Sequence, residues 1–356
     1  MAMLTKAQQV HKYICTAIAS GRWSVGEKLP GEDFLLEELE VSNTTLRHAL
    51  SSLAYEGIIV RKHGSGTYVS RVPATGNVAI LVKHDCVSSP MGYWYRKLVE
   101  QARARIEGSG YRAVLSVGHG DTPDAFMSSI NLFDGSVLRE TVGVLNTTGD
   151  GIVADRIAME GIPSVMIDAV AVPGSHCVLM DYSKMSELAV EMLRKRGHDE
   201  FALMYIDFSE ASEDGTGDQG YRELLKMLRA TVGFRDDLLV PVPFTPDFEQ
   251  AYERFKEWWS RPNRPKAIFF FDESLCDVAS RAILELGIKV PEELAIITHA
   301  QIGRQFQFPV MLTRLGWEIS EVMAAAWDML DRLIEKEPGV ESVIHIPPIV
   351  QEGESL

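Results

Sequence analysis

Residues 41–69 constrain the fold of this chain more than any other stretch. Apolar residues at helical spacing predict a helix from Ser42 to about Tyr55, whose inner face is formed by Leu46, Ala49, Leu50 and Leu53. A hairpin with a basic, glycine-rich tip, Arg61–Gly66, follows it. This is the order of a winged helix-turn-helix, in which the helix enters the DNA major groove and the hairpin contacts a flanking groove. The alternative, a small helical domain without a DNA contact, is disfavoured because element order, spacing and the polar helix face all agree.

The residues before this stretch supply supporting helices. Helical spacing predicts a first helix from Thr5, as its N-cap, to Ser20, and Gly21 ends it. A second, short helix is expected over Glu32–Leu39. Its expected core face consists of Phe34, Leu35 and Leu39. The hairpin strands are expected at Ile58–Val60 and Thr67–Val69.

The outer side of the Ser42 helix begins with short polar side chains and one arginine. These residues are Asn43, Thr44, Arg47 and His48. Short side chains let a helix seat deeply in a groove, and free N–H groups at a helix N-terminus can meet a phosphate. Arginine pairs with guanine or with the DNA backbone. We therefore predict that this end of the helix reads DNA.

The net charge of −15 argues against nucleic-acid binding only if it is taken for the whole chain. Residues 1–72 carry eight Lys and Arg against seven Asp and Glu, and the acidic excess belongs to the remainder. Because the first segment is only weakly basic, we expect few phosphate contacts and an affinity that is sensitive to salt.

Four motifs lie in this N-terminal region, between Gly26 and Val69. They are Gly26-x-Lys28-Leu29-Pro30-x-Glu32, Val41-Ser42-x-x-Thr45-Leu46-Arg47-x-Ala49-Leu50, Glu56-Gly57-Ile58 and Gly64-x-Gly66-Thr67-Tyr68-Val69. Together they resemble the DNA-binding domain of GntR-type bacterial transcription factors. The resemblance implies DNA contacts at Ser42, Asn43, Thr44, Thr45, Arg47, His63 and Gly66. Asp33 and Asn43 stand where many members carry arginine, which implies weaker phosphate binding or a different operator base.

The rest of the chain has the pattern of an α/β protein. Residues 73–77 form a short polar linker, so we expect a DNA-binding domain over 1–72 and an effector-binding and dimerisation domain over 78–356. Strand and helix patterns then alternate, which implies doubly wound parallel sheets. This segment is too long for one core, so we expect two such lobes with a cleft between them.

Several short sequence motifs lie along this segment. They are Val178-Leu179-Met180-Asp181-Tyr182-Ser183, Arg196-Gly197-His198, Gly220-Tyr221-Arg222-Glu223-Leu224, Pro265-Lys266-Ala267-Ile268-Phe269-Phe270-Phe271-Asp272 and Leu286-Gly287-Ile288-x-Val290-Pro291. They resemble the sensor domain of LacI-type repressors, which is itself like sugar-binding periplasmic proteins. The resemblance implies three crossings between two lobes, one holding about 77–178 and 303–334, the other 179–302 and 335–356. The crossings would form a hinge that closes on a ligand.

The effector site follows the family only in part. The family's sugar-binding Arg falls here on Gly217, and its last carboxylate falls on Ala300 or Gln301, whereas Asp272 is retained. Stacking is expected from Tyr93, Trp94 or Tyr221, and polar contacts from Asn146, Asp181, Asp272 or His299. For each of these residues a core or surface role without a ligand stays open.

Other motifs carry less weight. Gly215–Gly220 matches GxGxxG, but its neighbours Glu210, Glu213, Asp214 and Asp218 would repel a pyrophosphate. No nucleophile motif, metal motif or P-loop occurs, so no cofactor, metal or enzymatic activity is expected. The four cysteines lie far apart, which is typical of reduced thiols in a cytoplasmic protein. No apolar run of 18 residues and no signal peptide are found, so no membrane partner is expected.

The sequence predicts a cytoplasmic transcriptional regulator, most simply a repressor. A homodimer on a palindromic double-stranded operator is expected, because one small domain of this kind rarely binds tightly enough alone. A sugar-like small molecule in the cleft would control it. The alternatives are a regulator whose sensor has lost its small molecule and serves dimerisation or a protein partner, and an enzyme that uses the cleft.

Overall fold

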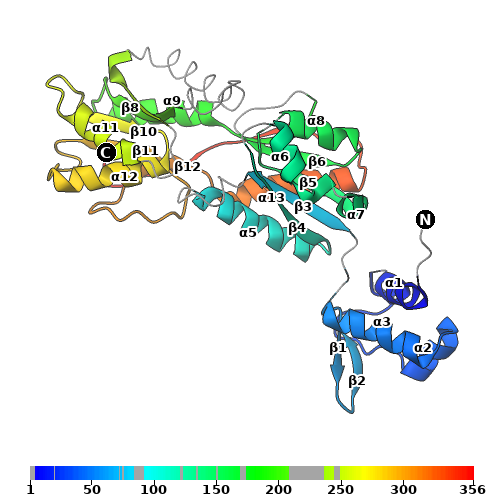
Figure 1. Cartoon of the computed structure of the whole chain (residues 1–356). Coiled ribbons are helices and arrows are strands. Elements are labelled where there is room, and N and C mark those ends of the chain that lie inside the picture. The colour runs from blue at the N-terminus through cyan, green and yellow to red at the C-terminus, as the bar shows by residue number, and fades with distance from the viewer. Residues whose placement is uncertain are drawn as a thin grey trace. The chain divides into compact units, whose positions relative to one another are not determined.

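The computed structural model describes residues 5–19, 21–71, 73, 76–83, 92–120, 123–133, 135–149, 151–168, 174–207, 236–243 and 249–356. The chain divides into two compact units, the first comprising Met1–Asn77 with Ile106–Arg112. The two units are described separately (Figure 1). The predicted helix over 220–228, the loop 215–220, Tyr221 and Gly217 lie outside the described residues.

The N-terminal unit contains three helices and a two-stranded hairpin, as the sequence predicts. Its elements are α1 (Lys6–Ala19), α2 (Glu32–Leu39), α3 (Asn43–Tyr55), β1 (Ile59–Lys62) and β2 (Gly66–Val69). The hairpin is antiparallel, with Ile59 opposite Val69 and Lys62 opposite Gly66. A bridge between Lys28 and Tyr68 adds the connector to its outer strand. The unit therefore has the winged helix-turn-helix architecture.

Local signals explain where the first helix begins and ends. The Thr5 hydroxyl accepts from the backbone N–H of Gln8 (3.3 Å), and the Gln8 side chain accepts in return from Thr5 N–H (2.9 Å). This reciprocal pair satisfies N–H groups that have no partner within the helix. Gly21 takes φ +75° at the other end, a conformation that glycine adopts without strain.

The prediction that Phe34 belongs to the core face of α2 is wrong. Leu35 is buried, and Leu36 and Leu39 pack against the core of the unit, but the Phe34 side chain is 52% exposed. Phe34 precedes Leu35 by one helical position, about 100° around the axis, which turns it away from the buried face. The core face of α3 is confirmed, because Leu46, Ala49, Leu50 and Leu53 are all buried.

The C-terminal unit contains two six-stranded sheets. The first sheet has the order β13-β7-β6-β5-β3-β4. Its strands are β3 (Asn77–Lys83), β4 (Arg112–Gly118), β5 (Thr141–Asn146), β6 (Ser164–Asp168), β7 (His176–Met180) and β13 (Val343–Ile346). The pairs β5–β6, β6–β7 and β7–β13 are parallel. We call this sheet and its helices lobe 1.

The second sheet has the order β14-β12-β11-β10-β8-β9. Its strands are β8 (Ala202–Asp207), β9 (Leu239–Pro243), β10 (Ala267–Phe270), β11 (Ala295–His299), β12 (Thr313–Gly316) and β14 (Ile349–Gln351). All pairs are parallel except β12–β14 at the edge. We call this sheet and its helices lobe 2. The predicted two-lobed parallel α/β fold is thus confirmed.

Helices connect and cover these strands (Figure 1). In lobe 1 they are α5 (Tyr93–Gly108), α6 (Pro123–Ser129), α7 (Gly135–Glu140), α8 (Gly151–Met159) and α13 (Ile319–Ile334). In lobe 2 they are α9 (Tyr182–Lys195), α11 (Glu249–Trp259) and α12 (Glu273–Glu285). Helix α13 packs on β5, β6 and β7, and α12 packs on β8, β10 and β11. Single-turn 3-10 helices occur at Asn131–Phe133 and Asp236–Leu238. Among the described residues, no helix is long and apolar enough to span a membrane.

Along the described residues the chain crosses between the lobes three times, as predicted, but only the first crossing lies close to its expected place. The crossings follow β7, β12 and β13. Residues 303–334 therefore do not all belong to lobe 1, because β12 pairs with β11 in lobe 2. Likewise 335–356 do not all belong to lobe 2, because β13 pairs with β7 in lobe 1. Both errors concern four-residue strands, whose sheet is decided by long-range pairing rather than by local pattern.

Candidate DNA-binding and effector sites

Ser42 fixes the start of α3. Its hydroxyl accepts from the backbone N–H of Thr45 (3.2 Å) and lies 2.8 Å from the Thr45 hydroxyl. Because Ser42 satisfies one of the free N–H groups of the first turn, the helix begins sharply at Asn43. Asn43 and Thr44 are exposed beside this cap, and Thr45 is half-buried. The predicted polar end of the helix is therefore presented to solvent.

Arg47 projects from the same exposed face. Its side chain is 69% exposed, and its Nε lies 3.9 Å from the Glu32 carboxylate at the start of α2. Arg61 on β1 approaches the other oxygen of Glu32, also at 3.9 Å. Exposed pairs at this distance contribute little to stability. The two pairs do, however, place the Glu32 carboxylate between a cation of α3 and a cation of the hairpin.

The hairpin tip depends on glycine. Gly66 has φ +127°, and a Cβ built there would lie 2.4 Å from Cε of Lys28. Tyr68 makes two contacts with the tip. Its hydroxyl lies 2.7 Å from the Ser65 hydroxyl, and the Lys62 ammonium lies 4.8 Å from the centroid of its ring. His63 is exposed at the tip. The tip is thus a compact, cationic turn with little room for side chains.

In the C-terminal unit, chemically capable side chains gather at the carboxyl ends of the parallel strands, where ligands of open α/β sheets bind. Asp272 follows β10 and caps α12, its Oδ1 accepting from Ser274 N–H at 2.7 Å. His299 ends the neighbouring strand β11 and is 5% exposed. Asn146 ends β5 in lobe 1 and is 1% exposed. The structure thus brings Asp272 and His299 to adjacent strand ends.

His299 is a neutral imidazole with one unused acceptor. Its Nδ1 lies 3.3 Å from the carbonyl oxygen of Phe271, so Nδ1 carries the proton and Nε2 carries a lone pair. Burial lowers the pKa of His299, against the opposing effect of the Asp272 carboxylate. Nε2 is buried without a hydrogen-bond partner among the described residues. Buried polar groups are normally paired, so this acceptor is available to a ligand or to a water molecule.

Asn146 presents the complementary group in lobe 1. Its carbonyl oxygen accepts from the backbone N–H of Thr148 (3.0 Å) and from the Thr148 hydroxyl (2.8 Å). These donors fix the orientation of the amide, and its Nδ2 is buried with no partner in the described part of the chain. Asn146 can therefore donate to a ligand.

Asp181 and Tyr93 have other contacts than those of a simple ligand site. Asp181 caps α9, its Oδ1 accepting from Lys184 N–H at 2.8 Å. The ring of Tyr93, at the start of α5, lies 5.7 Å from the guanidinium carbon of Arg304. Trp94 is half-buried at the same helix end. Ala300 and Gln301, one of which stands where the resemblance implies a carboxylate, are both buried.

Sequence reasoning missed an ion-pair network beside Asp272. Arg304 pairs with Glu273 (2.7 Å) and Asp277 (3.0 Å), and Glu273 also accepts from Gln301 N–H (2.9 Å). Burial raises the pKa of Glu273, while the charge of Arg304 acts in the opposite direction. No local pattern joins these residues, because Arg304 lies in an irregular segment after β11. Glu273 and Asp277 thus neutralise the charge of Arg304 close to Asp272.

An aromatic cluster at the lobe boundary was missed as well. Tyr182 lies near Trp317 (ring centroids 4.8 Å), His299 (5.6 Å) and Phe271 (5.9 Å). The sequence offered a signal for both rings, because Tyr182 comes two residues after β7 and Trp317 directly after β12, each at a crossing. The rings surround His299 and exclude water from it.

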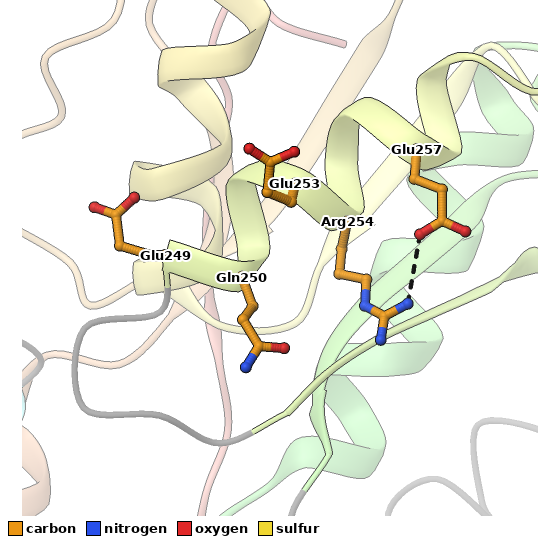
Figure 2. A pocket seen from close by; sticks show the side chains of 5 residues that line it. All are labelled: Glu249, Gln250, Glu253, Arg254 and Glu257. Carbon is orange, nitrogen blue, oxygen red and sulfur yellow. Dashed lines mark hydrogen bonds and ion pairs between the residues drawn. The ribbon is translucent and has the colours of Figure 1, made fainter.

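An open hollow along α11 does not qualify as a ligand site (Figure 2). Its lining residues are Glu249, Gln250, Glu253, Arg254 and Glu257. All five come from one helix, so groups from different elements do not converge there as in a ligand pocket. Arg254 is paired with Glu257 at 3.4 Å.

The described cysteines lack the properties of nucleophiles. Cys15, Cys177 and Cys276 are free thiols. Burial raises the pKa of Cys15 to about 11 and that of Cys276 to about 12. At neutral pH both are protonated, and the thiol form is the unreactive one. Cys86 lies outside the described residues.

Two protein-family models match separate parts of the chain. Residues 6–69 match the model of bacterial regulatory proteins of the gntR family. Residues 190–356 match the periplasmic-binding-protein-like domain. The chain joins a GntR-type helix-turn-helix domain to a periplasmic-binding-protein-like domain.

One relative matches nearly the whole chain, and two solved structures share the fold of most of it. The arabinose metabolism transcriptional repressor of Geobacillus stearothermophilus is 24% identical over 98% of this chain and 96% of its own length. A LacI family transcriptional regulator from Bifidobacterium animalis has the same fold over 79% of this chain and 98% of its own (TM-score 0.63, 19% identity). So does a LacI family regulator from Enterococcus faecium with bound ribose, over 78% and 98% (TM-score 0.60, 18% identity). These relatives are transcriptional regulators rather than enzymes.

Proposed function

We propose that this protein is a transcriptional repressor that binds DNA through α3 and the β1–β2 wing and responds to a small molecule held between its lobes. The observation that carries the proposal is the capped, exposed end of α3 beside a cationic wing, within the residues that match the gntR family. The proposed DNA-binding domain covers residues 1–72, the linker 73–77 and the sensor 78–356. A protein acting on the chromosome in this way works in the cytoplasm.

The proposed DNA contacts divide by type. Ser42, Asn43, Thr44 and Thr45 lie at the capped end of α3, where backbone N–H groups and hydroxyls suit phosphate contacts. Asn43 also suits adenine, and Arg47 suits guanine, in the major groove. His63 and Gly66 belong to the wing, where the absence of a Cβ lets the backbone approach DNA closely.

A homodimer on a palindromic operator is part of the proposal. The DNA-binding segment carries a net charge of only +1, so one copy makes few phosphate contacts. Two linked copies convert the second contact into an intramolecular step and so raise the overall affinity. A two-fold dimer matches a palindrome.

The effector we propose is a hydroxyl-rich, sugar-like molecule. His299 Nε2 and the carboxylate of Asp272 accept hydrogen bonds, and Asn146 Nδ2 donates one. A hydroxyl group can satisfy both kinds of partner. Tyr93, Trp94, Asp181 and Tyr221 remain proposed wall residues. The arabinose metabolism repressor and the ribose-bound regulator among the relatives support a sugar.

Replacing Arg47 tests the DNA-binding surface. The purified protein should retain a palindromic fragment from its own gene neighbourhood at low salt, and Arg47→Ala should weaken binding at least about tenfold, because a bidentate base contact is worth ~1–3 kcal/mol. Arg22→Ala is the matched control, since Arg22 is an exposed arginine paired with Glu38 outside α3 and the wing. Fluorescence anisotropy measures both. Equal losses in the two variants would remove Arg47 from the recognition surface.

A second function has one observation in its favour. Neither Ala300 nor Gln301, both buried, supplies the carboxylate that the LacI-type resemblance implies at one of these positions, which is expected if the sensor has lost its small molecule and serves only dimerisation or a protein partner. Thermal unfolding with L-arabinose, D-ribose, nucleosides and polyols separates the two functions, because a ligand that binds the folded state raises the unfolding midpoint. Stabilisation by one of them supports the ligand-controlled repressor, and stabilisation by none supports the second function.

A further inference from the structure

The three crossings between the lobes meet at one backbone carbonyl. The carbonyl oxygen of Ile346, at the end of β13, accepts from the backbone N–H of Asp181 (3.0 Å) and from the indole N–H of Trp317 (2.8 Å). Asp181 belongs to the crossing after β7, Trp317 to the crossing after β12, and Ile346 to the crossing after β13. One acceptor therefore holds all three strands of the hinge.

The Trp317 hydrogen bond is costly to break without a substitute. Trp317 is fully buried, so water cannot replace Ile346 as a partner for its N–H. The carbonyl uses its two lone pairs on Asp181 and Trp317, so both donors constrain the same atom. A shift of the indole must therefore move this junction or leave a buried donor unpaired.

The ring of Trp317 also forms part of the wall around His299. The two ring centroids are 5.3 Å apart in an edge-to-face arrangement, and Tyr182 packs against both rings. Nε2 of His299 is the buried acceptor without a partner among the described residues. The residue that holds the crossings thus packs directly on a residue of the proposed effector site.

We propose that Trp317 is the positioning residue that couples the effector site to the hinge between the lobes. Its N–H fixes the three crossings at Ile346, and its ring senses the position of His299 and Tyr182. A ligand that engages His299 in only one arrangement of the lobes then shifts the population of that arrangement through Trp317. The role of Trp317 in holding the crossings follows from its contacts alone. Its role in transmitting ligand binding rests on the proposed function.

The restraint that Trp317 places on the hinge can be measured as the distribution of distances between the two lobes. Spin labels are placed at Asp155 on α8 and at Glu253 on α11, two exposed positions in lobe 1 and lobe 2, in a background with the four cysteines replaced by alanine. Labelled protein is mixed with excess unlabelled protein, so that a dimer carries one labelled pair. Pulsed electron paramagnetic resonance then gives the distance distribution of the whole chain.

Trp317→Phe retains an aromatic ring but removes the N–H donor. We expect the population outside the main distance to rise about fivefold, the effect of one hydrogen bond. A second variant places 3-benzothienylalanine at 317, which keeps the shape of indole without its N–H, and it should give the same change even if the phenylalanine variant fails to fold. Unchanged distributions in the benzothienyl variant would overturn the hinge assignment.

Trp258→Phe is the matched control. Trp258 is an equally buried tryptophan in the core of lobe 2, away from the crossings. Its replacement lowers the unfolding temperature, as loss of buried ring volume does, but should leave the distance distribution unchanged. Equal broadening in Trp258→Phe would mean that Trp317 acts only through general stability.

His299→Ala tests the link to the effector site. It removes the ring on which Trp317 packs but none of the hydrogen bonds at Ile346, and we expect broadening in the same direction. An unchanged distribution would break the proposed coupling. These outcomes are independent of DNA binding, because retention of the operator fragment decides the proposed function and the distance distribution decides the role of Trp317.

Discussion

At the scale of single residues, His299 shows a hydrogen-bonding arrangement at the proposed effector site that its sequence context does not indicate. The sequence predicts it as one of several polar contacts, and the pattern of strand β11 gives no sign of which ring nitrogen carries a proton. The structure shows this through the Phe271 carbonyl, which can only accept and so requires a proton on Nδ1. Asp272 and Asn146 could be chosen from their positions after strands, but Arg304 and Glu273 could not, because only the folded chain brings them together.

Burial of His299 predicts a dependence of stability on pH. The folded-state pKa lies below the ordinary value of about 6.5, so the unfolded chain binds more protons near that pH. Stability contributed by the neutral ring is complete above pH 6.5 and is lost as the pH falls below it, by at most ~1.4 kcal/mol per pH unit. Urea unfolding from pH 7.5 to 5.5 should show a smaller decrease for His299→Gln than for the parent. His48→Gln, at an exposed position on α3, serves as control, and parallel curves for parent and His299→Gln would refute the prediction.

At the scale of elements, the wing shows how far local sequence can predict. Glycine spacing and alternation placed the hairpin within one or two residues, capping residues placed α1 and α3 equally well, and helical spacing placed α2. The short strands β12 and β13 were assigned to the wrong lobes, because four residues carry too little pattern and their neighbours are fixed by distant pairing. Phe34 shows the same limit within one turn of helix, where periodicity alone allowed two faces.

Gly66 provides the test at this scale. Gly66→Ala must place a Cβ on a residue with φ +127°, a conformation that L side chains rarely adopt, so the backbone of the wing tip is strained while the Lys28 side chain moves aside. Strain of this kind costs ~1–3 kcal/mol, and we expect a lower unfolding midpoint and at least about tenfold weaker operator binding. Gly31→Ala is the control, since a Cβ at Gly31 has no neighbour within 4 Å and the residue has φ −59°. Operator affinity that survives in Gly66→Ala would show that the wing does not contact DNA closely.

At the scale of the whole molecule, the distribution of charge links the weakly basic DNA-binding domain to assembly. Asp33 and Asn43 leave the exposed surface near α3 with fewer cations than a typical relative, while the sensor carries the acidic excess. Long-range attraction to DNA is therefore small, and the proposed homodimer would supply affinity through two copies acting together. In that proposal the sensor domain would hold the two copies together, and a change between its lobes would alter the geometry of the two DNA-binding domains.

Binding to half of the operator measures that dependence. We expect a duplex with one half-site to bind at least about 100-fold more weakly than the full palindrome, since the second contact then contributes no avidity. Fluorescence anisotropy at two salt concentrations gives both affinities, with a scrambled duplex of equal length as control, and sedimentation of the free protein gives its assembly state. A half-site bound as tightly as the palindrome would mean that each copy binds DNA alone. The sensor would then have to act on affinity within one chain rather than on the spacing of two.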